Sequence, residues 1–254
     1  MTDTLTAPRR LRIMWRLARV LETRAETPSA RTLVLDVPGW PGHRAGQHVD
    51  VRLTAEDSYQ TQRSYSIASP PEEGQVSLTV ERIEDGEVSP YLTGELRAGD
   101  VLELRGPIGG YFTWDAARDG GPLFLVAGGS GVVPLMSMLR HRAAMRSRVP
   151  ARLLYSARTV EEIFYRDELR RMAGGDADLQ IIQTLTREQP AGWTGHTGRI
   201  DRDLLASVAW GPQERPLTYI CGPTSLVEVM ASLLQAQGHD PVRLKTERFG
   251  PTGN

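Results

Sequence analysis

The sequence predicts an all-β domain followed by an α/β domain: antiparallel strands that form a barrel or a sandwich, then a parallel sheet with crossover helices. Two patterns carry this prediction. Up to about residue 115, short and often alternating apolar runs are broken by Gly, Pro and Asp, as in antiparallel strands. From Leu123 onward, continuous apolar runs alternate with helical spacing, as in a buried parallel sheet with crossover helices. The 254 residues suffice for two domains of ordinary size.

The first half contains six expected strands whose spacing suits an antiparallel barrel or sandwich. They are Trp15–Leu21, Thr32–Val37, His48–Leu53, Arg63–Ala68, Val76–Ile83 and Val101–Arg105. Glycines and prolines at residues 38–42 and the pair Asp85-Gly86 mark two of the connections. We expect a mobile tail at residues 1–14, the barrel at 15–115 and the second domain at 120–254.

The second half is expected to form five strands with helices between them. The strands are Leu123–Ala127, Arg152–Tyr155, Leu179–Leu185, Leu217–Cys221 and Val242–Thr246. The helices are Val133–Met145, Glu161–Met172, Asp201–Val208 and Ser225–Gln237. The first of these strands is entirely apolar, as expected of a strand that is buried on both faces.

The composition argues against several classes of protein. The single cysteine, Cys221, allows neither a disulfide within the chain nor a Cys-ligated iron–sulfur cluster. The five histidines form no close pair, so no metal site is expected. A formal net charge of -1 gives no electrostatic case for binding nucleic acid or an anionic membrane. No run reaches the ~18 apolar residues of a membrane span, and no signal peptide is evident, so a cytoplasmic location is expected.

A glycine-rich turn follows the first strand of the second domain. It reads Ala127-Gly-Gly-Ser-Gly-Val-Val-Pro134 and opens the helix expected next. In this context backbone N–H groups and the helix dipole face a pyrophosphate, and a side chain at Gly129 or Gly131 would obstruct its approach. The turn departs from GxGxxG, because Pro134 stands where a third glycine would be. The alternative is a tight strand–helix turn that binds nothing.

The ends of the next two strands bear on the choice of coenzyme. NAD-specific sites place an acid at the end of the second strand to bind the ribose 2′-hydroxyl, whereas an arginine there favours NADP. Here that strand leads into Arg158 with no acid, and Thr186-Arg187 follows the third strand. Both arginines are candidates to bind a 2′-phosphate by charge-assisted hydrogen bonds. The alternative for each is a solvated arginine in a loop.

The most specific string in the sequence is Arg63-Ser-Tyr-Ser-Ile-Ala-Ser69. Alone it would be an ordinary amphipathic strand, with Arg63, Tyr65 and Ile67 on one face. Together with its companions it resembles the R-x-Y-S/T flavin motif of the ferredoxin–NADP reductase superfamily. The companions follow in family order: Glu81-Arg-Ile-Glu-Asp-Gly-Glu-Val-Ser89, Gly106-Pro-Ile-Gly-Gly-Tyr-Phe112, Gly128–Pro134, Cys221-Gly-Pro223 and Glu247-Arg-Phe249.

This resemblance spans Trp15 to Phe249. It implies a six-stranded Greek-key barrel that holds FAD, followed by a Rossmann-like domain that binds NAD(P)H. It implies that Arg63 neutralises the flavin diphosphate, that Tyr65 packs beside the isoalloxazine or the ribityl chain, and that Ser66 lies near flavin N5. The candidate FAD residues are Arg63, Ser64, Tyr65, Ser66, Val80, Arg82, Gly86, Val88, Ser89 and Phe249.

The resemblance also supplies the candidate NAD(P) and catalytic residues. The Cys-Gly-Pro strand end lies beside the nicotinamide in this family, and Glu247 would relay protons or polarise Ser66. The NAD(P) candidates are Gly128, Gly129, Ser130, Gly131, Arg158, Thr186, Arg187, Arg199, Cys221, Gly222 and Pro223. The catalytic candidates are Ser66, Cys221 and Glu247. Without the family, Cys221 reads as a buried structural cysteine and Glu247 as a surface carboxylate.

Two local comparisons refine these expectations. The string Thr186-Arg-Glu-Gln189 resembles the family's Ser-Arg-Glu-Gln for the 2′-phosphate, which favours NADPH with NADH as the alternative. Residues Gly250–Asn254 extend beyond Phe249, which lies near the position of the aromatic that often ends plant-type members.

The expected function is therefore an FAD-dependent NAD(P)H oxidoreductase. It would take hydride onto FAD and pass electrons to a separate protein: a ferredoxin, a flavodoxin-like protein, a haem protein or a metal oxidoreductase. The chain has no spare length for a fused ferredoxin or haem domain. Two alternatives remain, namely a flavin reductase or diaphorase that reduces small acceptors, and a non-catalytic subunit that holds FAD for electron transfer.

Overall fold

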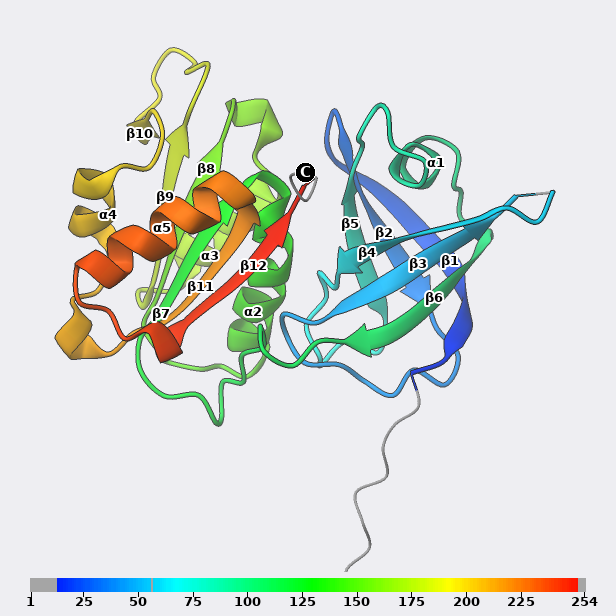
Figure 1. Ribbon diagram of the computed structural model, residues 1–254, viewed down its shortest axis with the longest axis horizontal. Helices are drawn as coiled ribbons and strands as arrows, with labels where there is room; N and C mark the ends of the chain where they lie inside the picture. The colour runs from blue at the N-terminus through cyan, green and yellow to red at the C-terminus, as the bar shows by residue number, and fades with distance from the viewer. Residues whose placement is uncertain (1–12, 56, 251–254) are drawn as a thin grey trace, which may run out of the picture.

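Two six-stranded sheets lie side by side in the computed structural model, which describes residues 13–55 and 57–250 (Figure 1). The first sheet is antiparallel and the second is parallel, with helices on both of its faces. This arrangement confirms the predicted fold class. Most of the tail expected at residues 1–14, and the extension beyond Gly250, lie outside the described residues.

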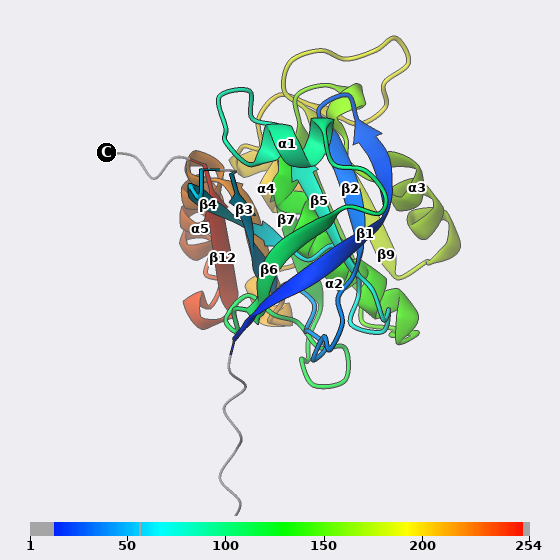
Figure 2. The same ribbon diagram turned by 90° about the vertical axis from the view of Figure 1, so that its right-hand side faces the viewer.

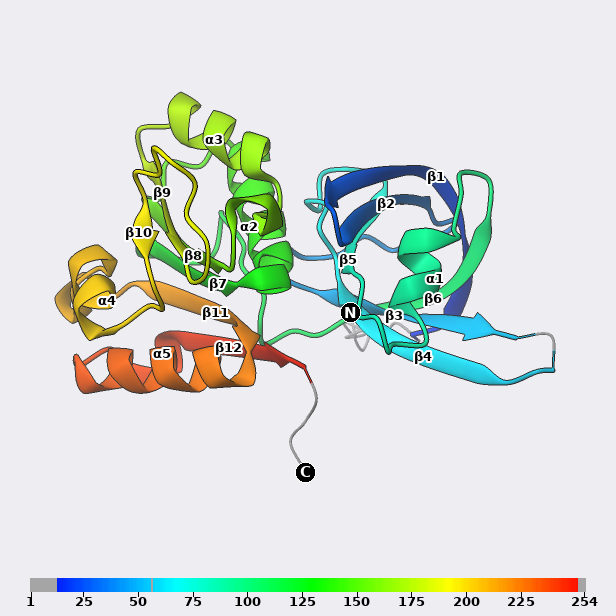
Figure 3. The same cartoon turned by 90° about the horizontal axis from the view of Figure 1, so that it is seen from above.

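The first sheet closes into a barrel. It contains β1 (Trp15–Thr27), β2 (Ala30–Asp36), β3 (His48–Thr54), β4 (Gln60–Ser66), β5 (Val76–Glu81) and β6 (Val101–Ile108). The strand order is β4-β3-β6-β1-β2-β5, and an antiparallel bridge between Ile67 and Leu78 joins the two outer strands. Fully buried aliphatic side chains such as Leu33, Val49 and Leu104 fill the interior. Figure 3 shows this barrel beside the layers of the second sheet.

All six strands predicted for the first half are present, but a short helix was not predicted. Helix α1 (Ser89–Gly94) follows the Gly86 turn, with a proline in its first turn. Figure 2 shows α1 lying against the barrel. The side chain of Leu92 is fully buried and belongs to the barrel core. Six residues are too few to establish a helical period, so the sequence pattern did not distinguish this helix from a loop.

The second sheet has the strand order β10-β9-β8-β7-β11-β12. Its strands are β7 (Leu123–Gly128), β8 (Ala151–Ala157), β9 (Leu179–Leu185), β10 (His196–Thr197), β11 (Leu217–Pro223) and β12 (Leu244–Phe249). The order reverses at β7, which has β8 on one side and β11 on the other. In open sheets of this kind, ligands bind outside the carboxyl ends of the strands at such a reversal.

Four helices cover the second sheet (Figures 1 and 3). They are α2 (Val132–Ala144), α3 (Arg166–Gly175), α4 (Arg202–Val208) and α5 (Thr224–Ala236). Alternate side chains of β7 enter two different cores. Leu125 packs with residues of α2 and α3, whereas Val126 packs with residues of α4 and α5. This two-sided burial explains why the strand reads as an uninterrupted apolar run.

Three details of the second half differ from the prediction. The helix expected from Glu161 begins only at Arg166, because Val160–Glu162 forms a 3₁₀ turn and Tyr165 adopts a left-handed φ of 56°. The last strand begins at Leu244, after another 3₁₀ turn at Pro241–Arg243. The two-residue strand β10 was not predicted, because two residues give no pattern.

Helix α2 joins the parallel sheet to the barrel. Its Ser137 Oγ donates to the carbonyl oxygen of Ser69 at 2.7 Å, and Arg140 Nη1 donates to that of Ala68 at 2.7 Å. Arg140 also makes two hydrogen bonds with Glu168, at 2.9 and 2.7 Å, and its guanidinium lies 4.8 Å from the centre of the Tyr165 ring. One largely buried arginine thus ties together α2, α3 and the chain that leaves the flavin motif.

We predict that Arg140→Ala lowers the free energy of unfolding by about 2–3 kcal/mol, because it leaves Glu168 without its partner in a partly buried site. Urea unfolding followed by circular dichroism measures this change. Arg171→Ala, at an exposed position of the same helix pair, is the control and should shift stability by no more than about 0.5 kcal/mol. Equal stabilities of the two variants would contradict the assigned role of Arg140.

Candidate active site

A cavity of about 380 Å³ opens at the carboxyl edge of the parallel sheet, between this sheet and the barrel. Five strands contribute to its wall: β5 from the barrel and β7, β8, β11 and β12 from the second sheet. The residues that the sequence analysis singled out and that line it are Gly128, Gly129, Arg158, Thr186, Arg187, Pro223 and Phe249. We call it the sheet-edge cavity.

The glycine-rich turn brings two of the predicted motifs into contact. Residues Gly129–Gly131 form a 3₁₀ turn between β7 and α2. A Cβ atom at Gly131 would lie 2.2 Å from the carbonyl oxygen of Cys221, so this turn packs directly on the end of β11. Gly129 has a φ of 53° and open space where its Cβ would be. The turn therefore has one face packed against the Cys-Gly-Pro strand end and one face free for a ligand.

The two arginines proposed for the 2′-phosphate have different surroundings. Arg158 pairs with Glu162 at 3.0 Å and with Glu81 of the barrel at 3.7 Å. Arg187 is exposed and forms no ion pair within the described part of the chain. Arg199 is exposed on the loop before α4 and does not line the sheet-edge cavity. The carboxylate partners of Arg158 distinguish it from Arg187, and a position outside the sheet-edge cavity distinguishes Arg199 from both.

A set of hydrogen-bond donors on the barrel holds the carboxylate of Glu87. Tyr59 Oη donates to it at 2.9 Å, Thr61 Oγ1 at 3.1 Å and Arg63 Nη2 at 3.3 Å. The donors come from β4 and the residue before it, and the carboxylate comes from the residue after Gly86, between β5 and α1. Hydroxyl and guanidinium donors that converge on one anion also suit phosphate oxygens. This part of the barrel therefore holds donors that are suited to an anionic group.

The turn that precedes Glu87 is tight. The backbone N–H of Gly86 donates to Ile83 at 2.9 Å, and the hydroxyl of Ser89 accepts from the backbone of Ile83 at 3.0 Å. Val88 is buried beneath the turn. Of the predicted residues here, Arg82 is exposed and pairs with Glu84. Val80 is fully buried, so it offers only its backbone to a ligand.

Two other residues of the flavin motif have defined environments. Ser64 Oγ donates to Asp50 Oδ1 at 2.6 Å, so this hydroxyl is already engaged within the sheet. Tyr65 is largely buried, and burial raises the pKa of its hydroxyl to about 12. The phenol therefore stays neutral near neutral pH and remains able to donate a hydrogen bond.

Glu247 of β12 lies at the contact between the two sheets. Its Oε1 is 3.8 Å from Nδ1 of His48 in β3, and its Oε2 is buried without a hydrogen-bond partner among the described residues. Burial raises the pKa of this carboxyl to about 7. The polar atom left without a partner indicates that the site is built to meet a further group.

The three catalytic candidates are connected through His48. Ser66 is the cross-strand neighbour of His48, and Cys221 is the cross-strand neighbour of Glu247. Burial raises the pKa of the Cys221 thiol well above its ordinary value, so it stays protonated and shapes the site as a small apolar group. His48 was not predicted from the sequence, because a histidine at the start of a strand carries no signal of its own.

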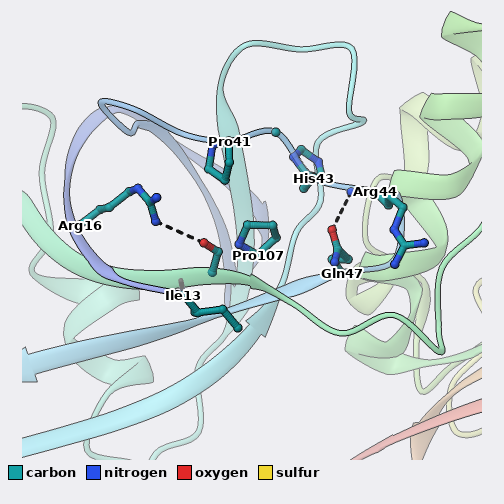
Figure 4. Close-up of a pocket in the computed structure, with 9 residues that line it drawn as sticks. Ile13, Arg16, Pro41, His43, Arg44, Gln47 and Pro107 are labelled. Carbon is teal, nitrogen blue, oxygen red and sulfur yellow. Dashed lines mark hydrogen bonds between the residues drawn. The ribbon is translucent and has the colours of Figure 1, made fainter. Parts of the chain in front are cut away.

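Another cavity, of about 460 Å³, lies on the barrel away from these residues (Figure 4). Its polar groups are largely engaged. His43 Nε2 contacts the carbonyl oxygen of Ser69 at 3.0 Å, and Gln47 Oε1 accepts from the backbone of Arg44 at 2.7 Å. None of the candidate site residues lines it, although Gly106 and Pro107 of the Gly106–Phe112 motif do. Within residues 13–55 and 57–250, no cluster suits a metal ion, and no helix has the length and apolar character to cross a membrane.

Comparison with known families agrees with this arrangement. The oxidoreductase FAD-binding domain family matches residues 18–113, which include the whole barrel after its first residues. The oxidoreductase NAD-binding domain family matches residues 125–232. The chain belongs to the ferredoxin–NADP reductase superfamily. Its barrel is the FAD-binding domain of that superfamily, and its parallel sheet is the NAD-binding domain.

Two curated relatives illustrate the similarity. The glycine betaine monooxygenase reductase subunit of Pseudomonas aeruginosa is 32% identical over 93% of this chain and 64% of its own length. NADH oxidoreductase HCR of Escherichia coli is 34% identical over 88% of this chain and 65% of its own length. The chain thus spans slightly less than two thirds of the length of these relatives.

Solved structures share the fold. The FAD/NAD-binding domain of nitric oxide dioxygenase from Vibrio cholerae has a TM-score of 0.83 at 23% identity, covering 93% of this chain and 99% of its own. A ferredoxin NADP⁺ reductase from Neisseria gonorrhoeae, solved with FAD and NADP, has a TM-score of 0.78 at 20% identity, covering 92% and 98%. Both superpose across the two domains.

We predict that Glu247→Gln stabilises the protein at pH 8 but not at pH 4. In the folded state the pKa of this carboxyl is about 7, above its ordinary value of 4.5. The folded protein therefore binds the proton more tightly, and the wild type loses stability as pH rises from about 4.5 to 7. The loss is up to about 3 kcal/mol, and glutamine removes it.

Thermal unfolding of both proteins between pH 4 and 8 measures this difference. Glu188→Gln, at an exposed position, is the matched control and should keep the wild-type pH dependence. If Glu247→Gln also keeps it, the carboxyl titrates normally and the description of its environment is wrong.

Proposed function

We propose that this chain is an FAD-dependent NAD(P)H oxidoreductase that passes electrons to a separate acceptor protein. FAD, when bound, accepts hydride from a nicotinamide and releases electrons one at a time. The observation that supports the proposal is that the barrel meets the parallel sheet beside the sheet-edge cavity. Glu247 meets His48 across the two domains at 3.8 Å, next to the strand ends that carry Ser66 and Cys221.

The residues of the chain have distinct roles in this proposal. Arg63, with Tyr59 and Thr61, binds the diphosphate of the flavin, which displaces the carboxylate of Glu87. Ser66 and Tyr65 line the flavin on the barrel side. The turn Gly128–Gly131 presents backbone N–H groups to the coenzyme phosphates, and Cys221, Gly222 and Pro223 border the nicotinamide. The domain contact excludes water from the position where hydride is transferred.

Arg187 is the group proposed to respond to the coenzyme 2′-phosphate. Arg158 is paired with two carboxylates, and a phosphate bound at Arg158 would lie close to both of these negative charges. The exposed guanidinium of Arg187 carries no such restriction. NADPH use therefore depends on Arg187. The carboxylates of Glu81 and Glu162 limit how much Arg158 contributes to binding the 2′-phosphate.

A separate acceptor protein is supported by the relatives, several of which are named as reductase components of monooxygenases. The alternative is a flavin reductase or diaphorase. Steady-state assays with NADPH or NADH and either free flavin or an added ferredoxin distinguish the two. Turnover with free flavin as fast as with any protein acceptor would favour the alternative.

We predict opposite effects on flavin affinity for two substitutions in the diphosphate donor set. Arg63→Ala removes a cationic donor and should weaken FAD binding at least tenfold. Glu87→Gln removes the anion that competes for the same donors and should strengthen FAD binding several-fold. Fluorescence titration of the flavin-free protein measures both, with Glu84→Gln as the control on the same turn. Unchanged affinity in both variants would contradict the assignment of this site.

We predict that Arg187→Ala raises the KM for NADPH about tenfold and leaves the KM for NADH unchanged, because only NADPH carries the 2′-phosphate. Arg158→Ala should have a smaller effect. Arg199→Ala, outside the cavity, is the control. An equal rise in the KM for both coenzymes after Arg187→Ala would mean that this arginine contacts a part of the molecule that NADPH and NADH share.

A further inference from the structure

A buried hydrogen bond joins the two domains beside the sheet-edge cavity. The hydroxyl of Tyr165, immediately before α3, donates to Thr79 Oγ1 of β5 in the barrel at 2.5 Å. Both side chains are buried. Phe164, the residue before this tyrosine, lines the cavity, and so does Glu81, two residues after Thr79. The bond therefore connects the wall of the cavity on one domain to its wall on the other.

This bond belongs to a chain of hydroxyl groups that ends on a carboxylate. Thr32 Oγ1 donates to Glu26 Oε1 at 2.7 Å and lies 2.7 Å from Thr79 Oγ1. Each hydroxyl has one proton to donate, so Thr79 donates to Thr32 and accepts from Tyr165. The direction of every bond is thus fixed, and the carboxylate of Glu26 strengthens the chain. Burial raises the pKa of the Tyr165 hydroxyl, which keeps this group a donor.

The backbone beside this hydroxyl is held in an uncommon conformation. Tyr165 has a φ of 56° and a ψ of 27°, in the left-handed region that costs free energy for a residue with a side chain. The N–H of Phe164 donates to the hydroxyl of Tyr155 in β8 at 3.1 Å. The turn is therefore tied to the parallel sheet through one residue and to the barrel through the next, and these bonds hold its strained geometry.

The same turn separates two cavities. Phe164 lines the sheet-edge cavity. Ile163 and Tyr165 line a second cavity, of about 450 Å³, which reaches the connection between β1 and β2 at Pro28. A wall between two cavities is packed less completely than a segment within a continuous core. The hydrogen bond from Tyr165 to Thr79 therefore supplies a fixed distance from the barrel that packing alone does not.

We propose that Tyr165 is a positioning residue: through Thr79, its hydroxyl fixes the Phe164 wall of the coenzyme site relative to the barrel and so sets the approach of the nicotinamide to the flavin. This inference rests on the proposed function. Tyr165 does not itself line the sheet-edge cavity, so it acts through the wall. Hydride transfer is sensitive to a displacement of about 1 Å. Freeing the wall should therefore lower the rate of transfer more than the affinity for the coenzyme.

The first experiment measures hydrogen–deuterium exchange in the protein as purified, without coenzyme. Tyr165→Phe removes only the hydroxyl, and peptides that cover residues 160–169 should exchange at least tenfold faster than in the wild type. Thr79→Val should have the same effect. Thr23→Val, on β1 of the same barrel, is the matched control and should leave these peptides unchanged. Unchanged exchange in Tyr165→Phe would overturn the proposal, whatever the activity of the protein.

The second experiment follows anaerobic flavin reduction in the holoenzyme by stopped flow, at a series of NADPH or NADH concentrations. Tyr165→Phe should lower the limiting rate constant at least tenfold and change the apparent Kd of the coenzyme less than twofold. Thr79→Val should do the same, and the double variant should be no slower than either single one, because all three lack the same bond. Thr79→Ser keeps the hydroxyl and should retain the wild-type rate.

Three results of this experiment would overturn the positioning role. They are an unchanged limiting rate in Tyr165→Phe, a loss confined to coenzyme affinity, and losses that multiply in the double variant. Absence of flavin reduction in the wild type would instead reject the proposed function. The exchange measurement would then still decide whether the bond between Tyr165 and Thr79 fixes the wall.

Discussion

The attachment of α2 to the barrel is the contact on which the rest of the site depends. Ser137 and Arg140 of this helix bind the carbonyl oxygens of Ser69 and Ala68, the last residues of the flavin motif. The same helix begins at the glycine-rich turn, whose Gly131 packs against Cys221. One helix therefore fixes the distance between the strand that carries Ser66 and the glycine-rich turn. Hydride transfer needs such fixed spacing, since the reacting atoms must approach to about 3–3.5 Å.

Charges are arranged around the reacting centre and not within it. Burial keeps Tyr65 and Cys221 neutral and makes Glu247 easy to neutralise, so the centre carries little fixed charge near pH 7. The arginines proposed to bind phosphates lie at the exposed periphery. A centre of low polarity flanked by cationic groups suits ligands whose reactive rings are neutral and whose diphosphates are charged. Glu247, whose pKa burial raises to about 7, has His48 as its neighbour.

The sequence predicted the parts of the structure that repeat a local pattern. Alternation predicted the six barrel strands, and the apolar run at Leu123–Ala127 predicted the central parallel strand. The sequence did not predict elements of only a few residues, or contacts between residues that are far apart in the chain. Helix α1 and strand β10 are too short to establish a period. His48 gains its place only because β3 brings it opposite β12, and the difference between Arg158 and Arg187 arises from Glu81 and Glu162. Such pairings join residues that are far apart in the chain, so local patterns do not contain them.

The central claim is that the two domains bring a flavin and a nicotinamide together for hydride transfer. Its most direct test is the visible spectrum of the anaerobic holoprotein before and after one equivalent of NADPH or NADH. The account predicts a bound yellow flavin that bleaches within seconds with at least one coenzyme, and more slowly in a variant that widens the domain contact, such as Arg140→Ala. A flavin that stays bound and oxidised with both coenzymes would contradict the account and leave a subunit that holds FAD without oxidising NAD(P)H.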